Sequence, residues 1–174
     1  QPMIFLKPPS ALLAPGDPII LPPQSEQVEY EGEIGVVLLE RLRNVSVAAA
    51  ERVRLGFVCV NDVTARDLQK TDGQWGRAKG FDSFCPVGPA VVEGLDWHTL
   101  EVTTRLNGAV KQHGKTADMA YSIPAIIAFI SSVMTLEPGD LIATGTPAGV
   151  GRLASGDIVE VEVTGVGVLR NPVK

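Results

Sequence analysis

Three carboxylate residues carry the clearest chemical signal in this sequence. Glu31 and Glu33 are separated by one glycine in the segment VEYEGEIGVVLL, whose β-branched second half predicts a strand over residues 28–39. Residues i and i+2 of a strand point to the same face, so these two carboxylates should project together. Like charges held close raise each other's pKa or bind a cation, and hard oxygen donors suit Mg²⁺, Mn²⁺ or Ca²⁺ rather than zinc. Taken alone, the pair also fits a solvated strand edge.

The third carboxylate, Asp62, follows a second apolar strand. It opens the segment Asp62-Val63-Thr64-Ala65-Arg66-Asp67-Leu68-Gln69. If this segment forms a helical turn, Asp62, Arg66 and Gln69 fall on one face, which would place a metal ligand beside two donors for an anion or a carbonyl. An N-capping aspartate followed by an ordinary surface arginine is the alternative.

Two more segments have residues suited to an anionic ligand. Lys79 is followed by the aromatic and small residues Gly80-Phe81-Asp82-Ser83-Phe84, a setting in which its charge could be partly desolvated and directed at a ligand, although surface lysines are commoner. Residues 144–151, which include Gly145 and Thr146, form a glycine-rich loop that could bring amides and hydroxyls to the same ligand. The loop lacks the Lys-Ser/Thr ending of a P-loop and the spacing of a dinucleotide fingerprint.

Other reactive side chains give weaker signals. His98 and His113 have no second histidine or cysteine at metal-ligand spacing, which favours surface positions. Ser131-Ser132 lacks the Gly-x-Ser-x-Gly pattern of a nucleophile elbow. Cys59 and Cys85 match no metal or redox spacing and are typical of buried thiols in a reducing compartment.

Strands dominate the elements that must position these residues. We expect two main helices, at 46–54 and 122–134, because Ser46 and Ser122 can each cap a first turn. Asn107-Gly108 predicts a hairpin, since both residues tolerate positive φ. The remaining pattern predicts a β-rich α+β fold, with strands at 56–63, 91–92, 100–106, 141–144, 157–163 and 166–169.

Composition limits the possible partners. The 174 residues suit one domain, and we find no repeat or linker that would divide it. A net charge of −5 without a Lys/Arg cluster argues against nucleic acid. The longest apolar stretch, residues 123–134, is too short for a membrane span, and no signal segment opens the chain, so we expect a cytoplasmic protein that does not bind membranes.

Taken in order, these segments resemble the fumarylacetoacetate hydrolase family, especially its small bacterial and mitochondrial members. The resemblance covers nearly the whole chain. It is carried by Phe5-Leu6-Lys7-Pro8, Tyr30-Glu31-Gly32-Glu33, residues 61–69, residues 79–86, Ser122-Ile123-Pro124 and Thr144-Gly145-Thr146-Pro147.

The resemblance implies a β-roll catalytic domain spanning residues 1–174, a homodimer, and a Mg²⁺ or Mn²⁺ ion. Matched residue by residue, the family's metal ligands fall on Glu31, Glu33 and Asp62. Contacts with the substrate's carboxylate and oxo groups fall on Arg66, Gln69 and Lys79, and the pocket lining falls on Gly145 and Thr146. Small members of the family carry a lid segment, with a His and a Glu that activate water, upstream of the region matching Phe5-Leu6-Lys7-Pro8. We expect that segment to lie outside this domain.

The resemblance also indicates a reaction class. A 2-oxo or 2-hydroxydienoic dicarboxylate would bind the metal through its C1 carboxylate and C2 oxygen, and the metal, aided by Lys79, would stabilise an enolate. Isomerisation of 2-hydroxyhepta-2,4-diene-1,7-dioate and C–C hydrolysis of acylpyruvates or fumarylpyruvate both pass through such a species. An oxaloacetate-type decarboxylase and a non-catalytic, metal-dependent carboxylate-binding module are the alternatives.

Overall fold

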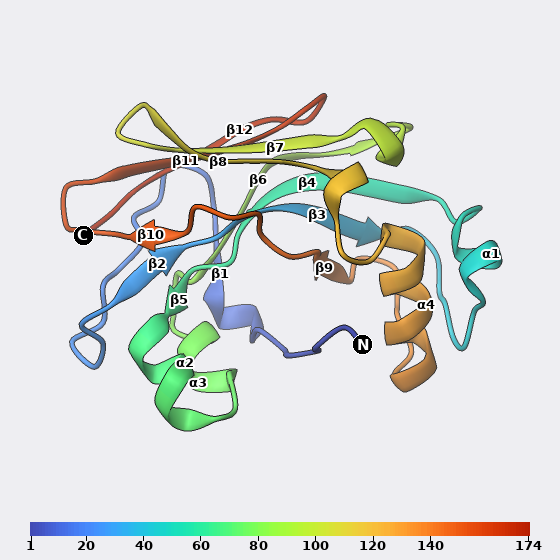
Figure 1. The fold of residues 1–174 in the computed structure, drawn as a ribbon, viewed down its shortest axis with the longest axis horizontal. Coiled ribbons are helices and arrows are strands. Elements are labelled where there is room, and N and C mark those ends of the chain that lie inside the picture. The colour runs from blue at the N-terminus through green and yellow to red at the C-terminus, as the bar shows by residue number, and fades with distance from the viewer.

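The central sheet runs through the middle of the molecule and carries the strands next to the predicted ligands (Figure 1). The computed structural model describes residues 1–174 and has the predicted sheet-rich α+β fold. β4 pairs antiparallel with both β3 and β6, so the segments holding the predicted ligands are neighbours. The five strands of this sheet, in spatial order, are β1 (Leu12–Leu13), β6 (Cys85–Glu93), β4 (Leu55–Asn61), β3 (Gly32–Leu38) and β9 (Leu141–Ala143).

Two smaller sheets complete the strand framework. The first lies across one face of the central sheet (Figure 1) and has the order β12 (Gly167–Pro172), β11 (Ile158–Val163), β7 (Glu101–Leu106) and β8 (Ala109–Lys115). The second has the order β10 (Gly151–Arg152), β2 (Val28–Tyr30) and β5 (Thr64–Ala65). Only Glu31 separates β2 from β3, so this predicted ligand marks the point where the chain passes from one sheet to another.

The helices are short and lie at the edges of the sheets. Ser46 and Ser122 cap their helices as predicted, each accepting a hydrogen bond from the amide three residues later. α2 begins only at Arg66, and α3 was not predicted; neither has a side-chain N-cap that would mark it in the sequence. None of the helices is long and apolar enough to cross a membrane. The four are α1 (Val47–Ala50), α2 (Arg66–Asp72), α3 (Gly76–Lys79) and α4 (Ile123–Val133).

The main hydrophobic core fills the space between the central and the four-stranded sheets. Ile34, Val36 and Leu38 of β3 pack there with alternate residues of β11 and with α4. Because side chains alternate along a strand, the residues between them, including Glu33, face the other side of the central sheet. The site is therefore built on the face that the four-stranded sheet does not cover.

One turn and one strand test the sequence patterns further. Asn107 and Gly108 have φ values of 52° and 79° and join β7 to β8, as predicted. β6 runs over Cys85–Glu93, although only Val91-Val92 was predicted as strand. Pro86, Gly88 and Pro89 break the apolar pattern, and the pairing of β6 with β4 is irregular between Phe57 and Cys59. The proline-rich half of β6 is therefore a strand held by its neighbours rather than by its own propensity.

Candidate metal centre

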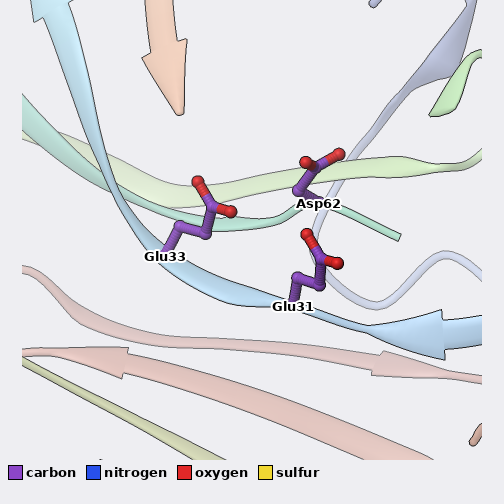
Figure 2. A group of neighbouring side chains, drawn as sticks. All are labelled: Glu31, Glu33 and Asp62. Atoms are coloured by element: carbon purple, nitrogen blue, oxygen red, sulfur yellow. The ribbon is translucent and has the colours of Figure 1, made fainter. Parts of the chain in front are cut away.

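The three predicted ligands come together on the face of the central sheet that the four-stranded sheet does not cover. Glu31 and Glu33 flank Gly32, which pairs with Asn61 at the end of β4, so Asp62 emerges beside them. The Asp62 amide donates to the Glu31 carbonyl at 2.8 Å, which fixes this junction. Figure 2 shows the three side chains projecting to the same side, and one carboxylate oxygen from each lies within 4.8 Å of the others. All three residues are buried.

Two lysines neutralise part of this cluster. Lys79 ends α3 and is only 2% exposed; its Nζ donates to Glu31 Oε2 at 2.7 Å and to Asp62 Oδ2 at 2.6 Å. Lys7 Nζ reaches Asp62 Oδ1 at 2.6 Å and the Lys79 carbonyl at 2.6 Å. The partly desolvated lysine expected at position 79 is thus fully buried, and a second lysine supports it.

Arg66 joins the cluster to a fourth carboxylate. Its Nε donates to Glu29 Oε2 at 2.8 Å, one terminal nitrogen to Glu31, and the other to Gln69 Oε1 at 2.5 Å. Burial alone would lower the pKa of Arg66, but its hydrogen bonds to the two glutamates raise it above its usual value. A guanidinium has five N–H donors, so two remain for a ligand.

Glu33 is the carboxylate without an ion pair. Its Oε2 accepts a hydrogen bond of 2.7 Å from the Gly145 amide. Burial is the main cause that raises its pKa to about 8, and the charges of Asp62 and Glu31 raise it further, against the opposing effects of Gly145 and Lys79. Without another cation, this side chain therefore holds a proton through most of the neutral range.

The donor set fits a hard divalent cation. Four buried carboxyl groups face three cationic side chains, so the group is neutral while Glu33 holds its proton and has one excess negative charge once Glu33 ionises. The ligand atoms that the cluster offers are carboxylate oxygens, as Mg²⁺, Mn²⁺ and Ca²⁺ prefer. The nearby thiol of Cys85 lines the same cavity, but burial raises its pKa to about 11, so it stays protonated. The cluster could therefore hold a divalent metal.

Every predicted site residue lines one cavity of about 1150 Å³. Apolar side chains of α4 and the N-terminal segment form much of its wall. Phe5 packs against Trp75 with ring centres 5.4 Å apart, and Lys79 Nζ lies 4.9 Å from the centre of the Phe5 ring. The predicted residues that line it are Glu31, Glu33, Asp62, Arg66, Gln69, Lys79, Gly145 and Thr146.

One detail of the predicted geometry was wrong. Asp62 does not lie on a helix with Arg66, because residues 64–65 form β5 and α2 starts at Arg66. Gly145 lines the cavity, and its amide donates to the Glu33 carboxylate. The glycine-rich loop thus holds a candidate metal ligand. The predictions for His98 and His113 as surface residues are confirmed, and Cys59 and Cys85 are buried free thiols.

Three residues at the site were not predicted. Lys7 was used only for the resemblance, with no role assigned, and Glu29 lies one residue outside the recognised acidic motif. Gln112 lies on β8 and hydrogen-bonds to the Gly32 amide. Lys7 lies 55 positions from Asp62, and Gln112 lies 80 positions from Gly32, so no local spacing could identify them.

Comparison with known proteins shows which protein family the chain is similar to. Residues 1–174 match the family model described as fumarylacetoacetate (FAA) hydrolase C-terminal. A protein of Archaeoglobus fulgidus is 52% identical, over 98% of this chain and 68% of its own length. Human mitochondrial oxaloacetate tautomerase FAHD2A is 40% identical, over 99% of this chain and 59% of its own length.

A solved structure agrees with these sequence matches. The crystal structure of 2-hydroxyhepta-2,4-diene-1,7-dioate isomerase from Mycobacterium marinum superposes with a TM-score of 0.95 at 52% identity, covering 99% of this chain and 69% of that one. Fold, sequence and the residues of the acidic cluster therefore lead to one assignment. The chain belongs to the fumarylacetoacetate hydrolase family.

Proposed function

We propose that this domain is the catalytic part of a divalent-metal-dependent enzyme that converts the enol form of a 2-oxo or 2-hydroxydienoic dicarboxylate into its keto form. The observation that carries the proposal is the buried cluster of Glu31, Glu33 and Asp62, in which one carboxylate oxygen from each residue lies within 4.8 Å of the others. The names of two relatives, an isomerase of a hydroxydienedioate and a tautomerase of oxaloacetate, support this reaction class.

The three carboxylates would hold the cation, which we take to be Mg²⁺ or Mn²⁺. As three of about six oxygen ligands, they leave positions for two substrate oxygens, those of the C1 carboxylate and of C2. When bound, the cation supplies Lewis-acid stabilisation for negative charge on the C2 oxygen. Glu33 has no ion pair within the protein, so a bound cation would provide the partner that its ionised carboxylate lacks.

Arg66, Gln69 and Lys79 would bind and polarise the substrate. Arg66 keeps two N–H donors after its contacts within the protein, enough for a carboxylate. Gln69 accepts from Arg66 and so keeps its amide N–H groups for an oxo group. Lys79 is 2% exposed, and a positive charge in so dry a site stabilises a developing anion more than a solvated one would.

Ketonisation moves one proton from the enol oxygen to a carbon, with no other change in atoms. We propose that the group that handles this proton belongs to a lid segment outside the catalytic domain formed by residues 1–174. We also propose that the protein forms a homodimer and is located in the cytoplasm. The same core would also suit C–C hydrolysis or decarboxylation, because each requires negative charge at the C2 oxygen.

The test compares substrates and metals on one preparation of the full-length protein, in which the proposed lid segment is present. Loss of the dienol absorbance of 2-hydroxyhepta-2,4-diene-1,7-dioate is followed with Mg²⁺, with Mn²⁺ and with EDTA, and the rate with metal but no protein is subtracted. We expect turnover only with metal. Equal rates with metal and with EDTA would overturn the metal mechanism. Cleavage of acylpyruvates or decarboxylation of oxaloacetate without isomerisation would replace the proposed reaction, and metal binding without any turnover would indicate a binding module.

Ligand assignment is tested by calorimetry with Mn²⁺. Glu33→Ala should abolish binding, because it removes one of the three carboxylates. Glu137→Ala is the matched control, since Glu137 is a glutamate with an exposed side chain paired to Arg41. Wild-type affinity in Glu33→Ala would show that the assigned ligands are wrong.

A further inference from the structure

Gln112 connects the strand of the acidic cluster to the loop that covers it. The residue lies on β8, is 1% exposed, and accepts a hydrogen bond of 3.0 Å from the Gly32 amide through its Oε1. Its Nε2 donates to Thr146 Oγ1 at 2.7 Å and to the Pro147 carbonyl at 2.8 Å. Thr146 Oγ1 in turn donates to the Gly32 carbonyl at 2.9 Å. The side chains of Gln112 and Thr146 therefore form a closed ring of hydrogen bonds with the backbone of Gly32, the glycine between Glu31 and Glu33.

The ring stands where a neighbouring strand is missing. β9 pairs with β3 only from Gly35 onward, and β10 pairs with β2 only up to Tyr30. Between these points the chain of residues 144–150 leaves the sheet, so the backbone of Gly32 has no strand partner on that side. A buried amide without a partner is destabilising, and Gln112 and Thr146 provide the acceptor and the donor that a strand would have provided.

Because residues 144–150 leave the sheet, Gly145 lies at the acidic cluster. Its amide donates to Glu33 Oε2 at 2.7 Å, and the next residue, Thr146, belongs to the ring. A shift of the loop relative to β3 would therefore move the group that orients the Glu33 carboxylate. Buried hydrogen bonds to the groups that orient metal ligands commonly change metal affinity when they are removed.

We propose that Gln112 is a positioning residue, which fixes residues 144–147 against β3 so that the Gly145 amide holds Glu33 in place to share a cation with Glu31 and Asp62. The proposal rests on the cation site of the proposed function. It assigns Gln112 no contact with substrate. Its effect is transmitted through the loop and is already present in the metal-free protein.

The test pairs Gln112→Met with Asn171→Leu. Asn171 is also 1% exposed, and its Nδ2 donates to the Ala14 and Asp17 carbonyls, so Asn171→Leu removes two hydrogen bonds of a buried amide and Gln112→Met removes three. We expect both variants to lose stability. Only Gln112→Met should weaken Mn²⁺ binding, by about tenfold or more in calorimetry. Only this variant should speed hydrogen exchange at the Gly145 amide in EDTA, by about tenfold.

Two results would overturn the proposal: Mn²⁺ affinity within about twofold of wild type in Gln112→Met, or unchanged exchange at Gly145. Should Gln112→Met fail to fold, Thr146→Val removes the hydroxyl that joins the same ring from the loop side, and it should weaken Mn²⁺ binding. Thr146→Ser keeps a hydroxyl and should bind Mn²⁺ as the wild type does. Equal Mn²⁺ affinities in these two variants would also overturn the proposal. If the wild type binds no Mn²⁺, the proposed cation site is wrong, whereas the exchange comparison still decides whether Gln112 holds the loop.

Discussion

Removing the carboxylate of Glu33 should change how the stability of the metal-free protein depends on pH. The pKa of this buried group is raised from 4.5 to about 8, mainly by burial. Between these values the folded protein holds a proton that the unfolded chain has released, so unfolding becomes more favourable as pH rises. The stability associated with protonated Glu33 is therefore fully present below about pH 4.5 and is lost as pH approaches about 8.

The size of the effect follows from the shift. Each pKa unit corresponds to about 1.4 kcal/mol, so between pH 5 and pH 8 the wild type should lose about 4 kcal/mol from this group. Glu33→Gln keeps the hydrogen-bonding shape without a titrating proton and should lack this loss. All other titrating groups are present in both proteins, so their contribution should cancel in the difference.

The assay is urea unfolding in EDTA at pH 5, 6, 7 and 8 for wild type and Glu33→Gln. We expect the difference in unfolding free energy to shift steadily in favour of the variant as pH rises. Saturating Mn²⁺ should remove most of the wild-type loss at pH 8, because the cation binds the ionised carboxylate. A difference that stays constant within about 1 kcal/mol over this range would refute a buried, protonated Glu33.

Three further changes have defined outcomes. Lys79→Met removes the cation shared by two buried carboxylates and should destabilise the metal-free protein by about 3 kcal/mol in urea unfolding. Adding Mn²⁺ should restore stability. An unchanged unfolding free energy in EDTA would contradict the ion pairs. Phe57→Ala, in the main core, should lose about 3–5 kcal/mol by the same assay. Its Mn²⁺ affinity in calorimetry should stay unchanged. Gly32→Ala would place a Cβ 1.9 Å from Thr104 Oγ1, so it should lower both stability and Mn²⁺ affinity, and Thr104→Ala in the same protein should restore part of each.

Much of the fold could be predicted because its signals are local. Serine caps mark α1 and α4, the Asn107-Gly108 pair marks the β7–β8 turn, and alternating apolar residues mark β11. The elements without such signals were missed. α3 has four residues and no cap, and the first half of β6 is rich in proline and glycine, so tertiary pairing rather than propensity decides both.

The acidic cluster was accessible to sequence reasoning for a similar reason. Glu31 and Glu33 are two positions apart on one strand, and strand geometry alone places them on the same face. Asp62 could be added because it ends the apolar strand next along the chain. Lys7 was assigned no role although it contacts Asp62 directly, since a single lysine between hydrophobic and proline residues has no pattern that distinguishes it from a surface lysine.

Gln112 shows why the remaining part of the site cannot be found this way. Its role depends on a place where strand pairing stops, between the end of β9 and the start of β10, and on a loop that leaves the sheet there. A local pattern can indicate that a strand is present, but the lack of a partner at Gly32 is a property of the assembled sheets. The backbone amide exposed by that gap must be satisfied inside the protein, and whichever buried side chain satisfies it acquires control over the loop. Residues that support the candidate metal ligands in this fold should therefore be sought beside the acidic cluster, where the pairing between strands is interrupted.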